Sequence, residues 1–428
     1  MSAISRLSAL EILDSRGNPT LQATCELESG CTASAKVPSG ASTGINEAVE
    51  LRDGDPQRYG GKGVLTAVAN VNSEIHGALT GMDPEDQRAV DSRLTELDGT
   101  DNKGRLGANA ILGASLAVAR ATAKERSMPL FEHLSRRDRY TLPVPMFNIL
   151  NGGQHADNNV DIQEFMVLPV GLSTFRDALR SAAEIFQTLK GILKGKGYNT
   201  AVGDEGGFAP QLRSNEEPME LLVAAIEKAG YAPGSEVYIG LDAAASEFCS
   251  DGLYVFDQSD GSSRDPSGMS AMWEDWAGRY PLLSLEDGFS EVDHAGWKIG
   301  TERLGQQLQL VGDDLFVTNP RIFASGIADG LGNSILIKLN QIGTLSETLD
   351  CIQMARDNGY TFIISHRSGE TADTTIADLA VSSGGGQIKT GSTCRSDRVA
   401  KYNRLLEIEA ALGPRATYAG RDAFRDWL

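Results

Sequence analysis

The sequence predicts an α/β protein with two domains, a smaller α+β domain followed by a (β/α)8-type barrel. Three observations lead to this prediction. The chain has 428 residues, too many for one hydrophobic core, because such cores stop growing at about 250–300 residues. Its first part alternates polar and apolar residues with the period of two that half-buried strands show. Its later part alternates strand-length apolar runs with amphipathic helices, as βα units do.

Residues 5–37 are predicted to form about three antiparallel strands, LSALEIL, TLQATCEL and CTASAKV, with a turn at 14–19. The loop at 37–44, VPSGASTG, consists of small residues and follows the third strand. Two interpretations of this loop stay open. Its local sequence favours a plain connector, and the alternative is a mobile lid whose Ser hydroxyls reach a ligand.

Residues 47–126 are expected to be mostly helical, and the last piece, 108–126, is rich in Ala and Leu at helical spacing. This pattern predicts a core helix that closes the first domain. The charged segment 135–139 then precedes Pro143 and Pro145, which mark a new start. We therefore expect an N-terminal domain at 1–134 and a catalytic domain at 140–428.

The second domain repeats one feature, strands that end in an ionisable side chain. Helices predicted at 174–194, 216–229, 345–357 and 398–412 separate these strands. Carboxyl ends of parallel strands meet at one face of a barrel, where active sites lie. An open sheet would also gather its ligands there, but the remaining length fits a barrel of typically ~250 residues better. The strand ends are Asp242, Glu286, Asp313, Lys338, His366 and Lys389.

Three carboxylates at one mouth would raise one another's pKa values unless a cation joined them. An all-oxygen ligand set suits Mg²⁺, so the pattern predicts a magnesium site. Spacing does not decide between Glu286 and Asp287, or between Asp313 and Asp314, but neighbours on a strand point opposite ways. Only one residue of each pair should therefore face the mouth.

Lys338 interrupts the apolar run SILIK at 334–338. Alone, it would most simply be a solvated lysine. Inside a charged mouth, burial would lower its pKa and make it a proton-abstracting base.

Three further segments offer chemistry beside the strand ends. The Gly-rich stretch 151–157 contains His155, which would be either a ligand contact or a turn residue. In GDEGGF at 203–208, glycines allow close backbone approach, and a carboxyl group there would act as a general acid if its pKa were raised. SHRSGE at 365–370 combines Arg and Ser ahead of a helix expected near Thr371, which favours an anion site.

Composition excludes several classes of protein. The 39 Lys and Arg against 58 Asp and Glu give a formal charge of −19, which argues against nucleic acid or an anionic membrane as the main partner. The five scattered cysteines have no CxxC spacing and predict free thiols in a reducing compartment. The N-terminus turns polar too soon for a signal peptide, and no apolar run approaches the ~20 residues of a membrane span. We expect a cytoplasmic protein.

Eleven short motifs follow one another along the whole chain. They are DSRGNPT (14–20), VPSGASTG (37–44), LGANAILG (106–113), NGGQHADNNVDIQEFM (151–166), GDEGGFAP (203–210), LDAAASEF (241–248), SLEDGF (284–289), VGDDLFVTN (311–319), IKLNQIGT (337–344), SHRSGET (365–371) and QIKTGS (387–392). Taken together, they resemble the motifs of the enolase (phosphopyruvate hydratase) family from end to end. Single segments of this kind are common, but their full set in the family's order is highly specific.

The resemblance implies a barrel that starts in an unusual ββαα order and a reversible dehydration of 2-phosphoglycerate to phosphoenolpyruvate with two Mg²⁺ ions. By motif, Asp242, Glu286 and Asp313 would hold the first ion. Ser39 in the lid loop would hold the second ion together with the substrate phosphate. Lys338 would remove the C2 proton, and Glu205, with Glu164 close by, would protonate the departing C3 hydroxyl. Substrate contacts would come from Arg367 and Ser368 to the phosphate, Lys389 to the carboxylate side, and His155, Gln163 and His366 along the pocket.

The chain departs from the family's pattern at two places. Gln22 and Glu407 stand where many relatives have an acid and an arginine that join subunits, so a homodimer is expected without that salt bridge. The last residues, Arg425 to Leu428, include no terminal lysine. This weakens a plasminogen-receptor role at the cell surface, which some enolases have.

Overall fold

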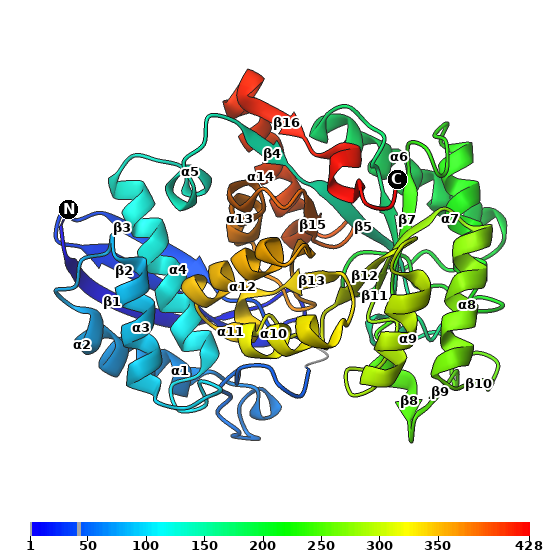
Figure 1. Ribbon diagram of the computed structural model, residues 1–428. Coiled ribbons are helices and arrows are strands. Elements are labelled where there is room, and N and C mark those ends of the chain that lie inside the picture. The colour runs from blue at the N-terminus through cyan, green and yellow to red at the C-terminus, as the bar shows by residue number, and fades with distance from the viewer. Residues whose placement is uncertain (1, 41–43) are drawn as a thin grey trace.

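The computed structural model describes residues 2–40 and 44–428 and places an amino-terminal α+β layer beside a barrel (Figure 1). The first layer begins with an antiparallel sheet in the order β1-β2-β3, which confirms the three predicted strands. Of the predicted loop 37–44, residues 41–43 lie outside the described residues. The strands are β1 (Ile4–Leu13), β2 (Pro19–Leu27) and β3 (Thr32–Lys36).

One buried helix covers this sheet. The helix α4 (Ala108–Glu125) packs on β2 and β3, and a Cβ added at Gly113 would lie 2.8 Å from Leu21 Cδ1. Small side chains on α4 therefore let helix and sheet approach closely, as the Ala-rich sequence predicted. The other helical segments of this layer are a 3-10 turn (Tyr59–Gly61), α1 (Leu65–Asn70), a π-helical turn (Val71–Ile75), α2 (His76–Leu79), α3 (Gln87–Asp98) and α5 (Leu130–Leu134).

The second layer is a closed barrel in the order β11-β12-β13-β14-β15-β5-β6-β7. The strand β6 pairs antiparallel with both β5 and β7, whereas the other neighbours are parallel. The barrel is thus mixed, and it starts with two strands followed by two helices. Its strands are β5 (Val144–Asn151), β6 (Glu164–Leu168), β7 (Tyr238–Asp242), β11 (Leu282–Glu286), β12 (Gln309–Gly312), β13 (Ser334–Ile337), β14 (Thr361–Ser365) and β15 (Gln387–Lys389).

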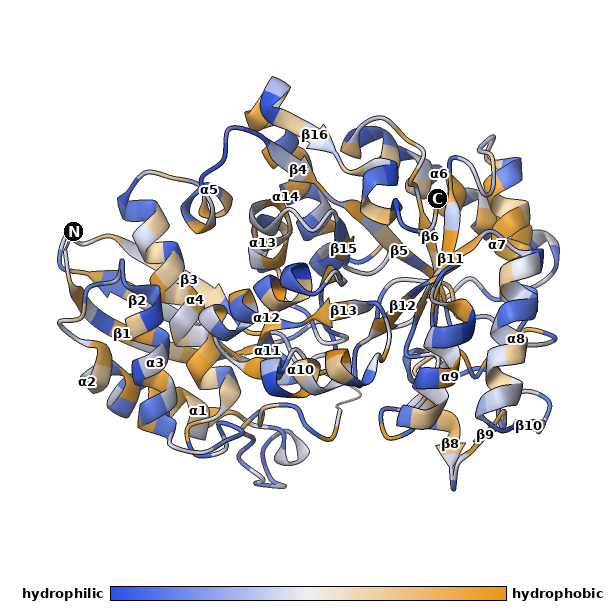
Figure 2. Ribbon diagram, in the orientation of Figure 1, coloured by the Kyte–Doolittle hydropathy of each residue, from blue (hydrophilic) through white to orange (hydrophobic). Residues whose placement is uncertain are grey.

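Helices surround the barrel, and Figure 2 shows apolar strands inside helices of mixed polarity. The four helices predicted for this part are present as α6, α7, α12 and α14. The barrel helices are α6 (Phe175–Gly195), α7 (Glu217–Lys228), α8 (Pro266–Arg279), α9 (His294–Leu304), α10 (Pro320–Asp329), α11 (Leu339–Ile342), α12 (Leu345–Asp357), α13 (Thr375–Ser383) and α14 (Ser396–Leu412). Short strands complete the fold: β4 (Tyr140–Leu142) with β16 (Ala416–Tyr418), and β8 (Cys249–Ser250), β9 (Leu253–Val255) and β10 (Ser263–Arg264).

The fold class is confirmed. The division into residues 1–134 and 140–428 stays a prediction. None of the helices in the described part of the chain is long and apolar enough to cross a membrane.

The interior of the barrel is layered by the period of two along each strand. Near the amino ends, Gln309 donates to Ser334, Thr361 and Gln387. The next layer is apolar and includes Val311, Leu336 and Ile363. Asp313 and Lys338 come two residues after Val311 and Leu336, just past the ends of β12 and β13, and Lys389 is the last residue of β15. The alternation that builds the core therefore turns these ionisable side chains into the mouth.

We predict that Ile335→Ala lowers the free energy of unfolding by about 2–5 kcal/mol, the usual cost of a truncated core isoleucine. Ile335 is fully buried on the outer face of β13, and α12 packs on this strand. Thermal or urea unfolding of the variant measures the loss. Leu10→Ala, at a leucine that is 50 % exposed, is the control and should change stability by less than ~0.5 kcal/mol. Equal effects at both positions would contradict the assigned core.

Candidate active site

Eleven of the thirteen predicted site residues line one small cavity at the carboxyl end of the barrel. The two exceptions are Glu286 and Ser39. Glu286 is buried next to this cavity, where it contacts Lys389. The eleven are His155, Gln163, Glu164, Glu205, Asp242, Asp313, Lys338, His366, Arg367, Ser368 and Lys389.

Lys389 forms the centre of one acidic cluster. Its Nζ lies 2.9 Å from Asp242 Oδ2, 2.8 Å from Glu286 Oε1 and 3.2 Å from Glu164 Oε1. Burial would lower the pKa of Lys389, but these carboxylates raise it well above its ordinary value. Lys389 is therefore an ammonium ion that partly neutralises the cluster.

Lys338 pairs with Asp313 on the opposite side of the mouth. Burial lowers the pKa of Lys338, as the sequence suggested, but the Asp313 carboxylate outweighs burial and the net shift is upward. The expectation of a lowered pKa is therefore wrong for this arrangement. Thr318, in the segment after β12, holds the backbone of the lysine in place, since the Lys338 N–H donates to Thr318 Oγ1 over 2.8 Å.

The expectation that one residue of each acidic pair faces the mouth is wrong for the second pair, because Asp313 and Asp314 both line the cavity. Of the first pair, Asp287 lines it, and one carboxylate oxygen from each of these three aspartates lies within 4.8 Å of the others. The reason is that β11 ends at Glu286 and β12 ends at Gly312, so strand alternation no longer applies. Asp287 adopts a φ of 41°, and its carboxylate accepts the N–H groups of Asp313 and Asp314 over 3.0 and 2.9 Å.

These aspartates retain protons more readily than ordinary carboxyl groups do. Burial, followed by the charge of Asp313, raises the pKa of Asp314 to about 8. Burial and Asp314 raise the pKa of Asp287 well above its ordinary value. Both shifts indicate more buried negative charge than the neighbouring cations balance.

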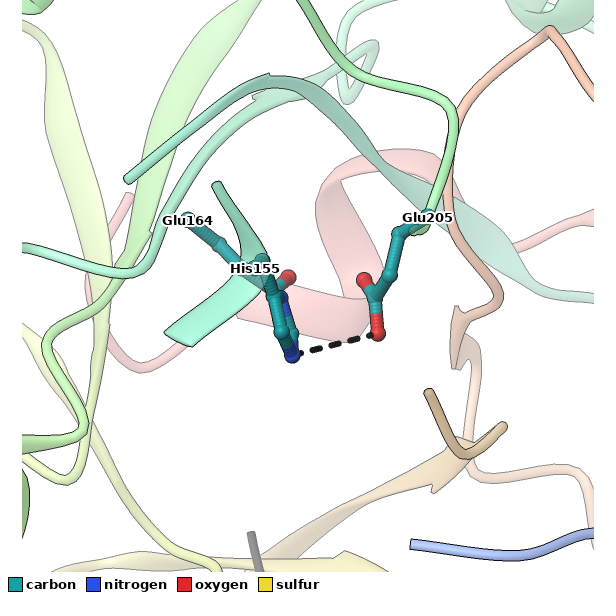
Figure 3. A group of neighbouring side chains, drawn as sticks. All are labelled: His155, Glu164 and Glu205. Atoms are coloured by element: carbon teal, nitrogen blue, oxygen red, sulfur yellow. Dashed lines mark ion pairs between the residues drawn. The ribbon is translucent and has the colours of Figure 1, made fainter. Parts of the chain in front are cut away.

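A second group, His155, Glu164 and Glu205, lies on the β5–β6 side of the mouth (Figure 3). His155 Nδ1 is 3.6 Å from Glu164 Oε1, and its Nε2 is 3.9 Å from Glu205 Oε1. Glu205 Oε2 also accepts from Asn148 Nδ2 over 3.0 Å and lies 3.3 Å from His366 Nε2. The imidazole of His155 thus stands between two carboxyl groups.

The two glutamates differ in protonation. Burial and the neighbouring Glu205 raise the pKa of Glu164 well above its ordinary value. Burial alone would raise the pKa of Glu205 too, but His366, His155 and Arg398 hold it well below the ordinary value. The raised pKa that a general acid at Glu205 would show is therefore found on Glu164 instead.

Arg367 and Ser368 follow β14 and line the same cavity. The helix expected near Thr371 begins later, at Thr375, so Ser368 is not at its N-terminus. Arg398 holds this segment in place. Its guanidinium is fully buried and donates to the carbonyls of Arg367 and Ser368 over 2.5 and 2.6 Å.

Ser39 lies apart from the cavity lining. Its backbone bridges Gly369, and its Oγ is 3.1 Å from Glu50 Oε2 and 2.9 Å from an Nη atom of Arg52. The hydroxyl is buried in these contacts, and its assignment as a metal ligand stays a prediction.

Sequence reasoning missed three side chains that contact the predicted site. Asn148 falls two residues after the inward-facing Met146 on β5, so the period of two could have identified it. Arg398 and Glu47, which pairs with Arg367, approach from distant segments and carry no local signal.

Comparison with known protein families covers almost the entire chain. The enolase N-terminal domain matches residues 4–134, and the enolase C-terminal TIM barrel domain matches residues 139–427. The chain belongs to the enolase family. Enolases are metal-dependent lyases of glycolysis (phosphopyruvate hydratases), and their reaction interconverts 2-phosphoglycerate and phosphoenolpyruvate. The resemblance inferred from the motifs is confirmed by these matches, as is the enzyme class.

We predict that the His366 imidazole stays neutral between about pH 7.5 and pH 5, because burial lowers its pKa to about 3 from an ordinary value of about 6.5. The folded chain then binds fewer protons than the unfolded chain in this range, so this residue lowers stability as the pH falls below about 6.5. Nitrogen NMR of the histidine rings measures the titration, and the signal lost in His366→Gln identifies the residue. A midpoint near the ordinary value would contradict the described burial.

Proposed function

We propose that this chain interconverts 2-phosphoglycerate and phosphoenolpyruvate with Mg²⁺, with Lys338 as the base at C2 and Glu205 as the acid at the C3 hydroxyl. The main support is that the two groups reach one cavity from opposite sides. In the closed strand order, β13, which precedes Lys338, lies across the barrel from β6, and Glu205 contacts residues of β5 and its following loop. A base and an acid on opposite sides suit removal of a proton and a hydroxyl group from adjacent carbons.

The charges of the cavity fit a divalent cation. Among the described residues, seven carboxyl groups gather around three cationic side chains, Lys338, Arg367 and Lys389. Asp242, Glu286 and Asp313 would hold the ion, since hard cations prefer carboxylate oxygen. Bound Mg²⁺ would supply positive charge that stabilises the negative charge developing at the substrate carboxylate. The seven are Glu164, Glu205, Asp242, Glu286, Asp287, Asp313 and Asp314.

A second ion held by Ser39 is a further part of the proposal. The Ser39 hydroxyl would first have to leave Glu50 and Arg52. Binding of a second ion would therefore accompany a rearrangement around Ser39.

Lys338 would act once its ammonium has lost a proton. Asp313 stabilises that ammonium, so the lysine becomes a base only when the negative charge of Asp313 is offset. The Glu164–Glu205 pair would provide the proton on the other side. Glu164 is the member whose pKa is raised. His155 lies between the two carboxyl groups, 3.6 Å from Glu164 Oε1 and 3.9 Å from Glu205 Oε1, so proton transfer through it would require both contacts to shorten to hydrogen-bond distance.

Substrate binding completes the proposal. Arg367 and Ser368 would bind the phosphate, since a guanidinium matches phosphate geometry. Lys389 would face the carboxylate side, and His155, Gln163 and His366 would line the remaining wall.

We also propose that the chain forms a homodimer or larger homo-oligomer in the cytoplasm. Glu407 pairs with Arg404 of its own chain. Many relatives have an arginine at this position that forms a salt bridge to the other subunit, and Glu407 would not form that salt bridge here.

We predict that Lys338→Ala lowers kcat by at least about 10³-fold, because no other base replaces the lysine, while Mg²⁺ binding is largely kept. The assay follows the absorbance of phosphoenolpyruvate after 2-phosphoglycerate is added, and calorimetry measures the metal. The unaltered chain should turn over with Mg²⁺ and stop when a chelator is added. Folded, metal-loaded protein without activity would refute the proposed reaction, and an active Lys338→Ala variant would refute the assigned base.

A further inference from the structure

A carboxylate from the amino-terminal layer meets the guanidinium expected to bind substrate phosphate. Glu47 Oε2 lies 2.9 Å from Arg367 Nη1, and Glu47 Oε1 lies 3.1 Å from Arg367 Nη2. Both side chains are buried, with exposures of 8 % for Glu47 and 3 % for Arg367. The pair is therefore a two-pronged, desolvated contact between segments 320 residues apart.

Glu47 and one barrel residue together fix the plane of the guanidinium. Asn340 Oδ1 accepts a second bond from Arg367 Nη1 over 3.0 Å. Among the described residues, these contacts involve three N–H groups of the arginine, all at the Nη1–Nη2 end. Because a guanidinium is planar and rigid, the direction of its Nε–Nη2 edge follows from them.

The same carboxylate is connected to the proposed metal ligand and base. Gln341 Nε2 donates to Glu47 Oε1 over 3.2 Å and to Asp313 Oδ1 over 2.9 Å. Gln341 Oε1 accepts from Thr318 Oγ1 over 3.0 Å, the hydroxyl that holds the Lys338 backbone. Gln341 is only 1 % exposed, so loss of any member leaves a buried polar group without its partner.

The segment that carries Glu47 is itself anchored on the barrel. The N–H of Ala48 donates to the Gln341 carbonyl over 2.8 Å, and the N–H of Gly44 donates to Glu47 Oε1 over 3.1 Å. The Cβ of a larger residue at Gly44 would lie 2.6 Å from Val317 Cγ1. These contacts therefore fix the position of the segment that carries Glu47.

We propose that Glu47 is a positioning residue, which aims the Arg367 guanidinium at the substrate phosphate and ties that aim to Asp313 through Gln341. The proposal rests on the assignment of Arg367 to phosphate under the proposed function. It assigns the amino-terminal layer a part in substrate affinity that does not depend on touching the substrate.

The test compares Glu47→Gln with the unaltered enzyme at saturating Mg²⁺. Glutamine keeps the size of the side chain but loses one acceptor oxygen and the charge. We expect the KM for 2-phosphoglycerate and the inhibition constant of inorganic phosphate to rise about tenfold, the scale of one lost charge-assisted hydrogen bond, while kcat changes less than about threefold. Glu47→Asp, which keeps the charge, should recover part of both constants.

The matched control is Glu347→Gln, at the ion pair between Glu347 and Lys103, whose Nζ lies 3.0 Å away. This pair also joins the amino-terminal layer to the barrel but does not contact Arg367. It should leave KM and phosphate inhibition unchanged. Equal shifts in both variants, or no shift in a Glu47→Gln protein that unfolds at the normal temperature, would overturn the positioning role.

Arg367→Ala separates this inference from the proposed function. If Arg367→Ala raises both constants and Glu47→Gln adds little in that background, the two residues act as one unit. If Arg367→Ala raises them and Glu47→Gln alone does not, only the positioning role fails. If Arg367→Ala leaves phosphate inhibition unchanged, Arg367 does not bind phosphate, and both its assignment to phosphate and the positioning role of Glu47 fail.

Discussion

The arrangement of the mouth depends on buried negative charge that its own cations do not balance. Two lysines are the chief compensation: Lys389 stands among Asp242, Glu286 and Glu164, and Lys338 stands against Asp313. Removing charged groups from water is costly unless partners replace the water. The raised pKa values of Asp287 and Asp314 are the signs of what is left uncompensated. The metal dependence of the enolase family follows naturally from such an excess.

The barrel creates this excess of negative charge because ionisable residues from the ends of many strands meet at one end of it. On β13, Ser334 belongs to the polar layer near the amino ends and Leu336 to the apolar layer, and Lys338, which directly follows the strand, lines the mouth. The antiparallel β6 adds Glu164 from the start of its strand rather than from its end. The amino-terminal layer contributes Glu47, which pairs with Arg367. The amino-terminal layer and the barrel therefore both contribute charged side chains to one site.

Much of the site could be predicted because strand ends in a barrel are fixed by simple alternation. Asp242, Lys338 and Lys389 follow from apolar runs that end in a charge. Alternation stops where a strand stops, so the orientations of Asp287 and Asp314 could not be predicted. The antiparallel β6 and the long-range contacts of Glu47 and Arg398 depend on tertiary packing, which no local pattern records. The pKa direction at Lys338 likewise depends on Asp313, a neighbour 25 residues away.

Mg²⁺ binding, measured by calorimetry and by thermal unfolding after chelator treatment, tests the role of this charge excess most directly. Mg²⁺ should bind the unaltered chain and raise its unfolding temperature, since a ligand of the folded state stabilises it. Asp242→Asn should weaken binding at least about tenfold. Glu217→Gln, at a buried carboxylate outside the cavity, should not weaken it. If Mg²⁺ fails to bind the folded chain, or binds both variants equally well, the carboxylate excess at the mouth does not hold the metal.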